Sequence, residues 1–225
     1  MIQQNSGKKE KIEKMVTPVC RISYPSVFVP SLPMGKTDEK EAKYSVTMLF
    51  DMSDPVVAKG VQGLVEFAKQ AGIKAWGADQ SKWPAIKFPL FRRGDEPGKK
   101  NQDGTWKPGF GPNIMFTKAS IRCIKKDGSK REPPPVVDVQ GVPIIDPALF
   151  YGGCYGRVFL SASAYEGFMG NTGISFTLWS LRKEKDGEKF AMAHDAADDF
   201  AGIEAPEGSA IPPAAAGGSA AGFGF

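Results

Sequence analysis

The chain has 225 residues, of which 41% are hydrophobic and 11% aromatic, so it can bury one sizeable core. Glycine (26) and proline (18) are frequent while helical periodicity is scarce, which predicts a β-rich fold with many turns. Three scattered cysteines exclude a disulfide framework and favour a reducing cytoplasm. The sequence shows neither a signal-peptide pattern nor an apolar run of membrane length, so we expect no membrane partner.

The charges are distributed unevenly. All 29 Lys and Arg residues and 20 of the 25 acids lie in residues 1–190, which gives this part a net charge of +9. Residues 191–225 contain five acids and no Lys or Arg. A basic body joined to an acidic segment predicts a polyanionic partner, and the alternative is a solubilising tail on a mildly basic domain.

Composition divides the chain into three expected parts. Residues 1–15 are polar and lysine-rich and are expected to form a flexible basic arm. Residues 16–190 are expected to form one folded domain. Residues 191–225 are acidic and then rich in Gly, Ala and Pro, so they are expected to be a flexible tail, which ends in Phe.

Strand signals, which are short runs of β-branched and aromatic residues between turn residues, recur along the chain. The first run is expected to be broken by Pro25 and Pro30, because proline cannot donate a backbone hydrogen bond. A hairpin turn is expected at residues 126–128. The expected strands are residues 19–30, 43–50, 114–125, 136–139, 155–164 and 172–182.

One helix is predicted after the second strand. Asp54 is a good N-cap and Pro55 suits the first helical position. Gly72 is expected to end the helix. The apolar residues at helical spacing, which should pack on the barrel, are Val57, Val61, Leu64, Val65 and Ala68.

An irregular region follows the helix, at residues 74–112, with five prolines and six glycines. A region of this length inside a domain is usually functional or disordered. Trp76 and Phe88 are expected to pin it to the barrel. The side chains in it that are expected to bind a polyanion by charge or by ring stacking are Arg92, Arg93, Lys99, Lys100, Trp106, Lys107 and Phe110.

Two of the expected strands have a small apolar face and an opposite face of basic, aromatic and hydroxyl side chains. Bases stack on aromatic rings with about 1–3 kcal/mol each, and cations follow phosphates, so neither contact needs a particular base sequence. The alternative is that the rings are buried and the cations are ordinary surface residues. The candidates on these strands, expected to share one concave surface with the irregular region, are Phe116, Lys118, Arg122, Arg157, Phe159 and Tyr165.

The sequence contains no pattern of an active site. Its one histidine, His194, lies at the start of the acidic tail, and the close Cys or His pairs of a zinc site are missing. The segment 94–100 (GDEPGKK) lacks the spacing and the Ser/Thr of a phosphate-binding loop. We therefore predict no metal, no cofactor and no catalysis.

The order of several segments resembles that of the OB-fold single-stranded DNA-binding proteins of tailed bacteriophages. These segments are SYPSVFVP, YSVTMLFDMSDP, VVDVQGVPIIDPALFYGGCYGRVFLSASAY and GISFTLWSLRKEKDGE, followed by the acidic tail with its terminal Phe. The resemblance covers about residues 17–200. It implies an all-β, OB-type barrel of five strands with one main helix and a long basic insertion.

The resemblance also implies a function. Members of that family coat unwound DNA during replication and recombination, which for a phage takes place in the host cytoplasm. Tyr165 corresponds to the family's groove aromatic, and Arg157 to a basic residue on the same strand face. The family's acidic tail competes with DNA and docks on the polymerase and the helicase-primase, which implies that Asp198, Asp199 and Phe225 bind partners. Here the last 18 residues carry no charge, which weakens the expected competition.

Three other readings fit parts of the same sequence. A phage structural or assembly protein would share the β-rich composition but would not bind oligonucleotides. A strand-annealing recombination protein would bind single strands and also promote their pairing. A nuclease would need clustered carboxylates, which the expected folded part does not offer in an obvious triad.

Overall fold

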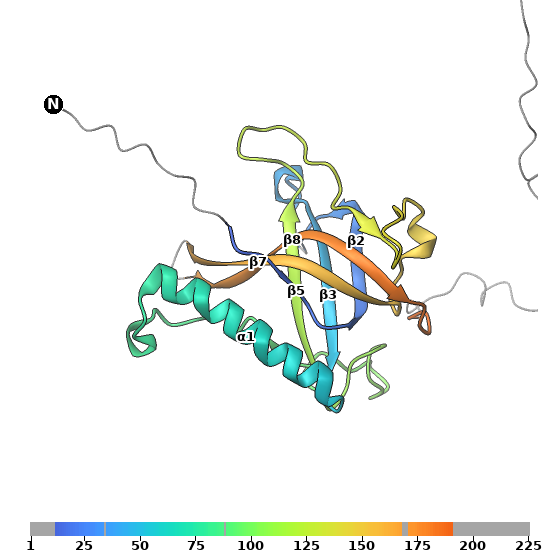
Figure 1. The fold of residues 1–225 in the computed structure, drawn as a ribbon, viewed down its shortest axis with the longest axis horizontal. Helices are drawn as coiled ribbons and strands as arrows, with labels where there is room; N and C mark the ends of the chain where they lie inside the picture. The colour runs from blue at the N-terminus through green and yellow to red at the C-terminus, as the bar shows by residue number, and fades with distance from the viewer. Residues whose placement is uncertain (1–11, 34, 88, 168–170, 191–225) are drawn as a thin grey trace, which may run out of the picture. The chain divides into compact units, whose positions relative to one another are not determined.

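The computed structural model describes residues 12–33, 35–87, 89–167 and 171–190 (Figure 1). The chain divides into two units, residues 1–190 and 191–225, and the description below concerns the first. The three tail residues expected to bind partners, Asp198, Asp199 and Phe225, lie outside the described residues.

The described part is β-rich with one long helix, as expected. The helix is α1 (Pro55–Trp76), and single-turn 3₁₀ helices lie at Glu39–Glu41, Gln80–Lys82 and Pro147–Leu149. The strands are β1 (Met15–Val16), β2 (Cys20–Ser31), β3 (Lys43–Asp51), β4 (Arg92–Arg93), β5 (Ile114–Arg122), β6 (Val136–Val137), β7 (Tyr155–Gly167) and β8 (Asn171–Lys185).

Five of these strands close into a barrel, which confirms the expected architecture. The order around the barrel is β2-β3-β5-β8-β7, and β7 pairs with β2 again through Cys20 and Gly156. The β5–β8 pair is parallel, and the other pairs of the ring are antiparallel. The short strands β1, β4 and β6 extend the sheet from β7, β5 and β8.

Strand alternation fills the barrel with apolar side chains. On β3 the inward residues Tyr44, Val46, Met48 and Phe50 are all buried, since successive side chains point to opposite faces. The apolar stripe of α1 joins the same core and packs beneath the barrel (Figure 1). The helical residues buried in this cluster are Val61, Leu64 and Ala68.

The helix begins as expected but ends later. The Asp54 carboxylate accepts hydrogen bonds from the backbone N–H groups of Val56 (2.8 Å) and Val57 (3.3 Å). The predicted stop at Gly72 is wrong, because Gly72 is a packing position: the Trp83 ring lies directly against its Cα. The helix ends instead before Gly77, whose φ of 91° favours glycine.

Two strand predictions also need correction. Pro25 does not end the first strand, because β2 continues through a register shift between Ser23 and Ser26, with Tyr24 at a φ of 46°. The turn at 126–128 does form, but it joins Ile124 to Lys130, while β6 pairs in parallel with β8.

The folded part also begins earlier than expected. Met15, assigned to the flexible arm, pairs with Leu160 of β7, and the Lys14 ammonium lies 3.8 Å from the centroid of the Trp179 ring. Within the described ranges, no helix has the length and apolar character needed to span a membrane.

The packing of Trp83 on Gly72 gives a stability prediction. Gly72→Ala should destabilise the fold by about 1–3 kcal/mol, because the new methyl group would overlap the indole ring. Urea unfolding followed by tryptophan fluorescence measures the effect. Gly63→Ala is the matched control, since a Cβ there meets Met15 Cε at an ordinary 3.6 Å and alanine favours the helix by about 1 kcal/mol. Equal stability of the two variants would contradict the packing role of Gly72.

Candidate nucleic-acid interface

A row of small hydroxyl side chains crosses the outside of the barrel. Ser45 of β3 is paired with Ser120 of β5, and Ser120 is paired with Thr177 of β8. Directly paired residues point to the same face of a sheet, and their inward neighbours, such as Ala119 and Phe176, belong to the core. The hydroxyl row, in order around the barrel, consists of Ser26, Ser45, Ser120, Thr177 and Ser161. Larger neighbours bury Ser45 and Ser161, while Ser26, Ser120 and Thr177 are half-buried.

Two lysines lie beside this row on the outer face of β3 and β5. Lys118 is paired with Thr47, and Lys43 with Arg122. Within the described ranges, neither Lys43 nor Lys118 forms an ion pair, whereas Arg122 lies 3.5 Å from Glu41. Partial burial and the charge of Lys43 lower the pKa of Lys118. An anion bound here would relieve this repulsion, so the face favours a phosphate.

The Phe110 and Phe116 rings lie at one end of this face, but they are buried. They are 7% and 6% exposed and pack edge to face with centroids 5.3 Å apart. The Lys99 ammonium covers both rings, at 4.6 Å from the Phe110 centroid and 4.3 Å from that of Phe116. The expectation that both rings are exposed stacking surfaces is therefore wrong. The outward face of β5 is covered here by Leu49 and by the glycine-rich segment, residues 109–111, which carries Phe110.

The cations of the irregular region divide into paired and unpaired groups. Arg92 forms an ion pair with Glu96, and Arg93 with Asp95 at 2.6 Å. The Lys100 ammonium lies 4.5 Å from the centroid of the half-buried Trp106 ring. In the described part of the chain no ion pair involves any of three lysines, which are Lys99, Lys100 and Lys107.

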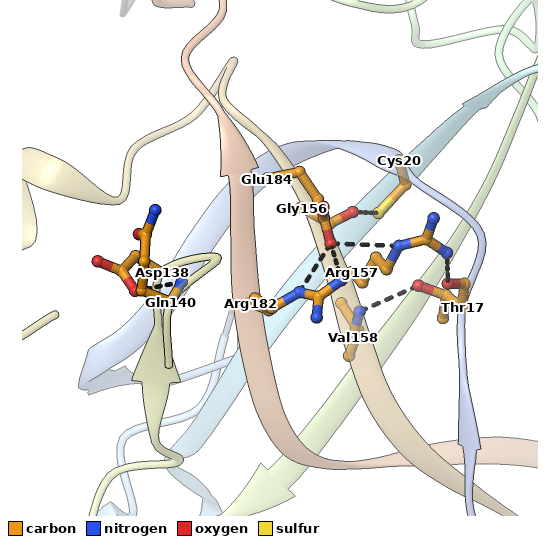
Figure 2. A network of polar contacts seen from close by, with 9 residues as sticks. All are labelled: Thr17, Cys20, Asp138, Gln140, Gly156, Arg157, Val158, Arg182 and Glu184. Atoms are coloured by element: carbon orange, nitrogen blue, oxygen red, sulfur yellow. Dashed lines mark hydrogen bonds and ion pairs between the residues drawn. The ribbon is translucent and has the colours of Figure 1, made fainter. Parts of the chain in front are cut away.

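Arg157 lies in a separate polar network, where β1, β2 and β7 meet (Figure 2). Its Nε is 3.2 Å from the Glu184 carboxylate, and its Nη1 donates to the Thr17 carbonyl oxygen at 3.1 Å. Glu184 also pairs with Arg182 at 2.7 Å. The Arg157 guanidinium therefore holds the strand junction together, and its charge is matched by a carboxylate.

The network also contains a buried thiol. Cys20 Sγ donates to the Gly156 carbonyl oxygen at 3.3 Å, across the pair of strands that closes the barrel. Burial raises the pKa of Cys20 to about 12, so the thiol remains neutral at physiological pH.

Phe159 and Tyr165 lie further along β7, on its outward face. Phe159 is half-buried and lies 5.6 Å from the Lys14 ammonium. The Tyr165 ring packs on Gly173 of β8, where an added Cβ would come within 2.7 Å of its hydroxyl oxygen. Both rings are ordered by their neighbours and partly accessible.

The candidates thus fall on two faces instead of one. β8 lies between β5 and β7 in the ring, so the outward faces of β5 and β7 diverge. The β7 face carries Arg157, Phe159 and Tyr165. The face of β3, β5 and the irregular region, called the β3–β5 face below, carries Arg92, Lys99, Lys100, Trp106, Lys107, Phe110, Phe116, Lys118 and Arg122. Arg93 is paired with Met115, which packs against the core, so its side chain points to the opposite side of β4 from Arg92.

The described residues form no candidate metal site. Among residues 12–33, 35–87, 89–167 and 171–190, no cluster of three or more His, Cys, Asp or Glu side chains could hold an ion.

Comparison with known protein families identifies the family of this barrel. A family model described as "Enterobacter phage Enc34, ssDNA-binding protein" matches residues 13–210. The chain belongs to this family. No curated protein matches the chain.

Solved structures share the fold at low sequence identity. The single-stranded DNA-binding protein from bacteriophage Enc34 is 18% identical, with a TM-score of 0.55, and the match covers 83% of this chain and 89% of that one. The same Enc34 protein in complex with ssDNA gives 18% identity, a TM-score of 0.54 and coverages of 79% and 89%. The single-stranded DNA-binding protein gp2.5 encoded by bacteriophage T7 is 15% identical, with a TM-score of 0.55, and the match covers 81% of this chain and 97% of that one.

Sequence reasoning missed several residues that this member of the Enc34 family places on the candidate faces. Lys43, Ser45 and Thr47 share one parity of an expected strand, so alternation could have identified them. Trp179 lies two residues after Thr177 on β8, so the same alternation could have identified it. Lys14 was assigned to a flexible arm.

The buried ring cluster yields a second stability prediction. Phe116→Ala should destabilise the fold by about 3 kcal/mol, because it leaves a cavity between Leu49 and Phe110. Val139→Ala is the control, since Val139 is 50% exposed and should change stability by less than about 0.5 kcal/mol. Chemical denaturation of both variants checks this. A loss as small for Phe116→Ala as for Val139→Ala would mean that the ring is exposed in solution.

Proposed function

We propose that this protein binds single-stranded DNA without sequence preference and without catalysis, and coats unwound phage DNA in the host cytoplasm during replication and recombination. Membership of the Enc34 family supports this proposal. The observation that carries it is the β3–β5 face, where Lys43 and Lys118, which have no ion-pair partner among the described residues, lie beside the hydroxyl row.

The chemistry of this face suits a sugar–phosphate backbone. Lys43 and Lys118 repel each other and would each gain a partner from a phosphate. The half-buried hydroxyls of Ser120 and Thr177 can donate and accept hydrogen bonds, so they can pair with phosphate, sugar or base groups alike. None of these contacts selects a particular base, which is consistent with binding to any sequence.

The irregular region supplies the stacking contacts in this proposal. Trp106 is half-buried beside Lys100, and an unpaired base could replace the ammonium on its ring. Lys99 and Lys107 provide charge along the same segment. A base pair hides its ring faces in the helical stack, so this contact favours a single strand over a duplex.

The other predicted residues keep narrower roles. Arg92, Arg93 and Arg122 would have to exchange an exposed carboxylate for a phosphate, which costs little because exposed ion pairs contribute little. We propose Phe159 and Tyr165 as contacts on the β7 face. Binding of the polymerase or the helicase-primase through Asp198, Asp199 and Phe225 stays a prediction from the family resemblance.

Salt dependence provides the test. Lys118→Ala should weaken binding and lower the slope of log affinity against log salt by about 0.7, the value for one phosphate contact on a single strand. Fluorescence anisotropy with a labelled single strand, and with the matching duplex, at several salt concentrations measures both effects.

Lys126→Ala is the matched control, because Lys126 is an exposed lysine in the turn after β5. It should leave the affinity and the slope unchanged. Identical behaviour of the two variants would remove the β3–β5 face from the proposal, and equal affinity for duplex and single strand would contradict the preference for unpaired DNA.

A further inference from the structure

A cavity of about 300 Å³ lies between α1 and the outward side of β7 and β8. Its lining combines two aromatic rings with hydroxyl, amide, ammonium and carboxylate groups: Glu13, Phe67, Gln70, Lys74, Thr177 and Trp179. It lies outside the β3–β5 face, and the proposed function makes no use of it.

We propose that this cavity is a second nucleotide subsite, in which one base of the bound strand stacks on Trp179 while a neighbouring phosphate is held by Lys14 and Lys74. The inference rests on the proposed function and extends the path of the same single strand around the barrel.

Trp179 is held in a fixed position for stacking. Its Nε1 donates to Ser161 Oγ at 3.0 Å, and the side chain is half-buried. A ring that is already ordered loses little conformational freedom when a base packs on it. The Lys14 ammonium lies 3.8 Å from the centroid of this ring. Stacking of a base would displace the ammonium toward the adjacent phosphate, where it gains a full charge partner.

The rim of the cavity carries one exposed ion pair and several neutral polar groups. Lys74 forms an ion pair with Glu13 at 3.3 Å, and both side chains are more than half exposed. Such a pair contributes little to stability, so Lys74 can bind a phosphate instead. The hydroxyls of Ser163 and Thr177 and the exposed amide of Gln70 offer both donors and acceptors for the edge of a base.

The hydroxyl row connects this cavity to the β3–β5 face. Ser45 and Ser120 lie on that face, and the row continues through Thr177 to Ser161, which line the cavity. With neighbouring strands about 4.8 Å apart, the row from Ser45 to Ser161 spans about 14 Å, the length of a few nucleotides. A strand bound on the β3–β5 face can therefore reach Trp179 over the low, half-buried side chains of Ser120 and Thr177.

Binding as a function of oligonucleotide length tests the subsite in the full-length protein. Short oligo(dT) that covers only the β3–β5 face should bind Trp179→Ala and wild type equally. Longer oligo(dT) should bind Trp179→Ala about 5- to 150-fold more weakly, the loss of one stacked base. Trp179→Phe should recover most of this loss, because it keeps an aromatic ring.

A charge variant keeps the test valid if Trp179→Ala folds poorly. Gln70→Glu places a negative charge at the rim of the cavity, on an exposed helix position, and should weaken binding of long oligonucleotides alone. Gln62→Glu, at an exposed position of the same helix that does not line the cavity, should bind like wild type. Photocrosslinking with a strand that contains 5-iodouracil, followed by mass spectrometry, should identify Trp179.

The outcomes separate the two proposals. If wild type binds no oligonucleotide of any length, the proposed function fails. If wild type binds but long oligonucleotides bind Trp179→Ala and Gln70→Glu as tightly, with crosslinks confined to the β3–β5 face, the subsite is overturned and the function stands. Equal weakening of short and long oligonucleotides by Gln70→Glu would also overturn a separate subsite.

Discussion

β7 is paired on both edges, with β8 along its length and with β1 and β2 near its start, and this double pairing closes the barrel. Closure decides which side of each strand faces the core and which faces solvent. It also determines how far apart two outward faces lie. The polar network around Arg157 and Thr17 lies at the junction where β7 changes partner from β1 to β2 (Figure 2).

Local patterns predicted the elements well, because each pattern has a local physical cause. The Asp54 cap and the apolar stripe after it identified α1, and alternation identified β3, β5, β7 and β8. The end of α1 could not be predicted locally, since it depends on Trp83, eleven residues after Gly72, packing on that glycine. The parallel pairing of β6 with β8 is likewise a contact between distant segments.

The candidate site was predictable in its residue types but not in its arrangement. Alternation correctly placed Phe116, Lys118 and Arg122 on one side of β5. It could not show that the glycine-rich segment covers Phe116, or that β5 and β7 are separated by β8. A strand's two faces are a property of its own sequence, whereas the angle between the faces of two strands is a property of the closed barrel.

Several arginines of the barrel and the two lysines beside the hydroxyl row differ in their partners. Arg21, Arg93 and Arg157 each approach a carboxylate, which suits the forked guanidinium group. In the described part of the chain, Lys43 and Lys118 have no such partner, although they lie on the same side of the barrel. These three arginines therefore contribute mostly to holding loops and strand junctions, and Lys43 and Lys118 keep their charge available to a ligand. Elsewhere lysines do pair with carboxylates, as Lys183 does with Asp186.

The small side chains of the hydroxyl row explain how a single strand of DNA can be bound without selection of particular bases. Large side chains at Ser45, Ser120 or Thr177 would form pockets of defined shape, and a pocket selects the base that fits it. Serine and threonine leave a low surface that a backbone can approach closely, and each hydroxyl turns to donate or accept as its partner requires. In the proposed mode of binding, phosphates pair with the cations beside the row and bases stack on the rings at either end, so none of these contacts would depend on which base is present.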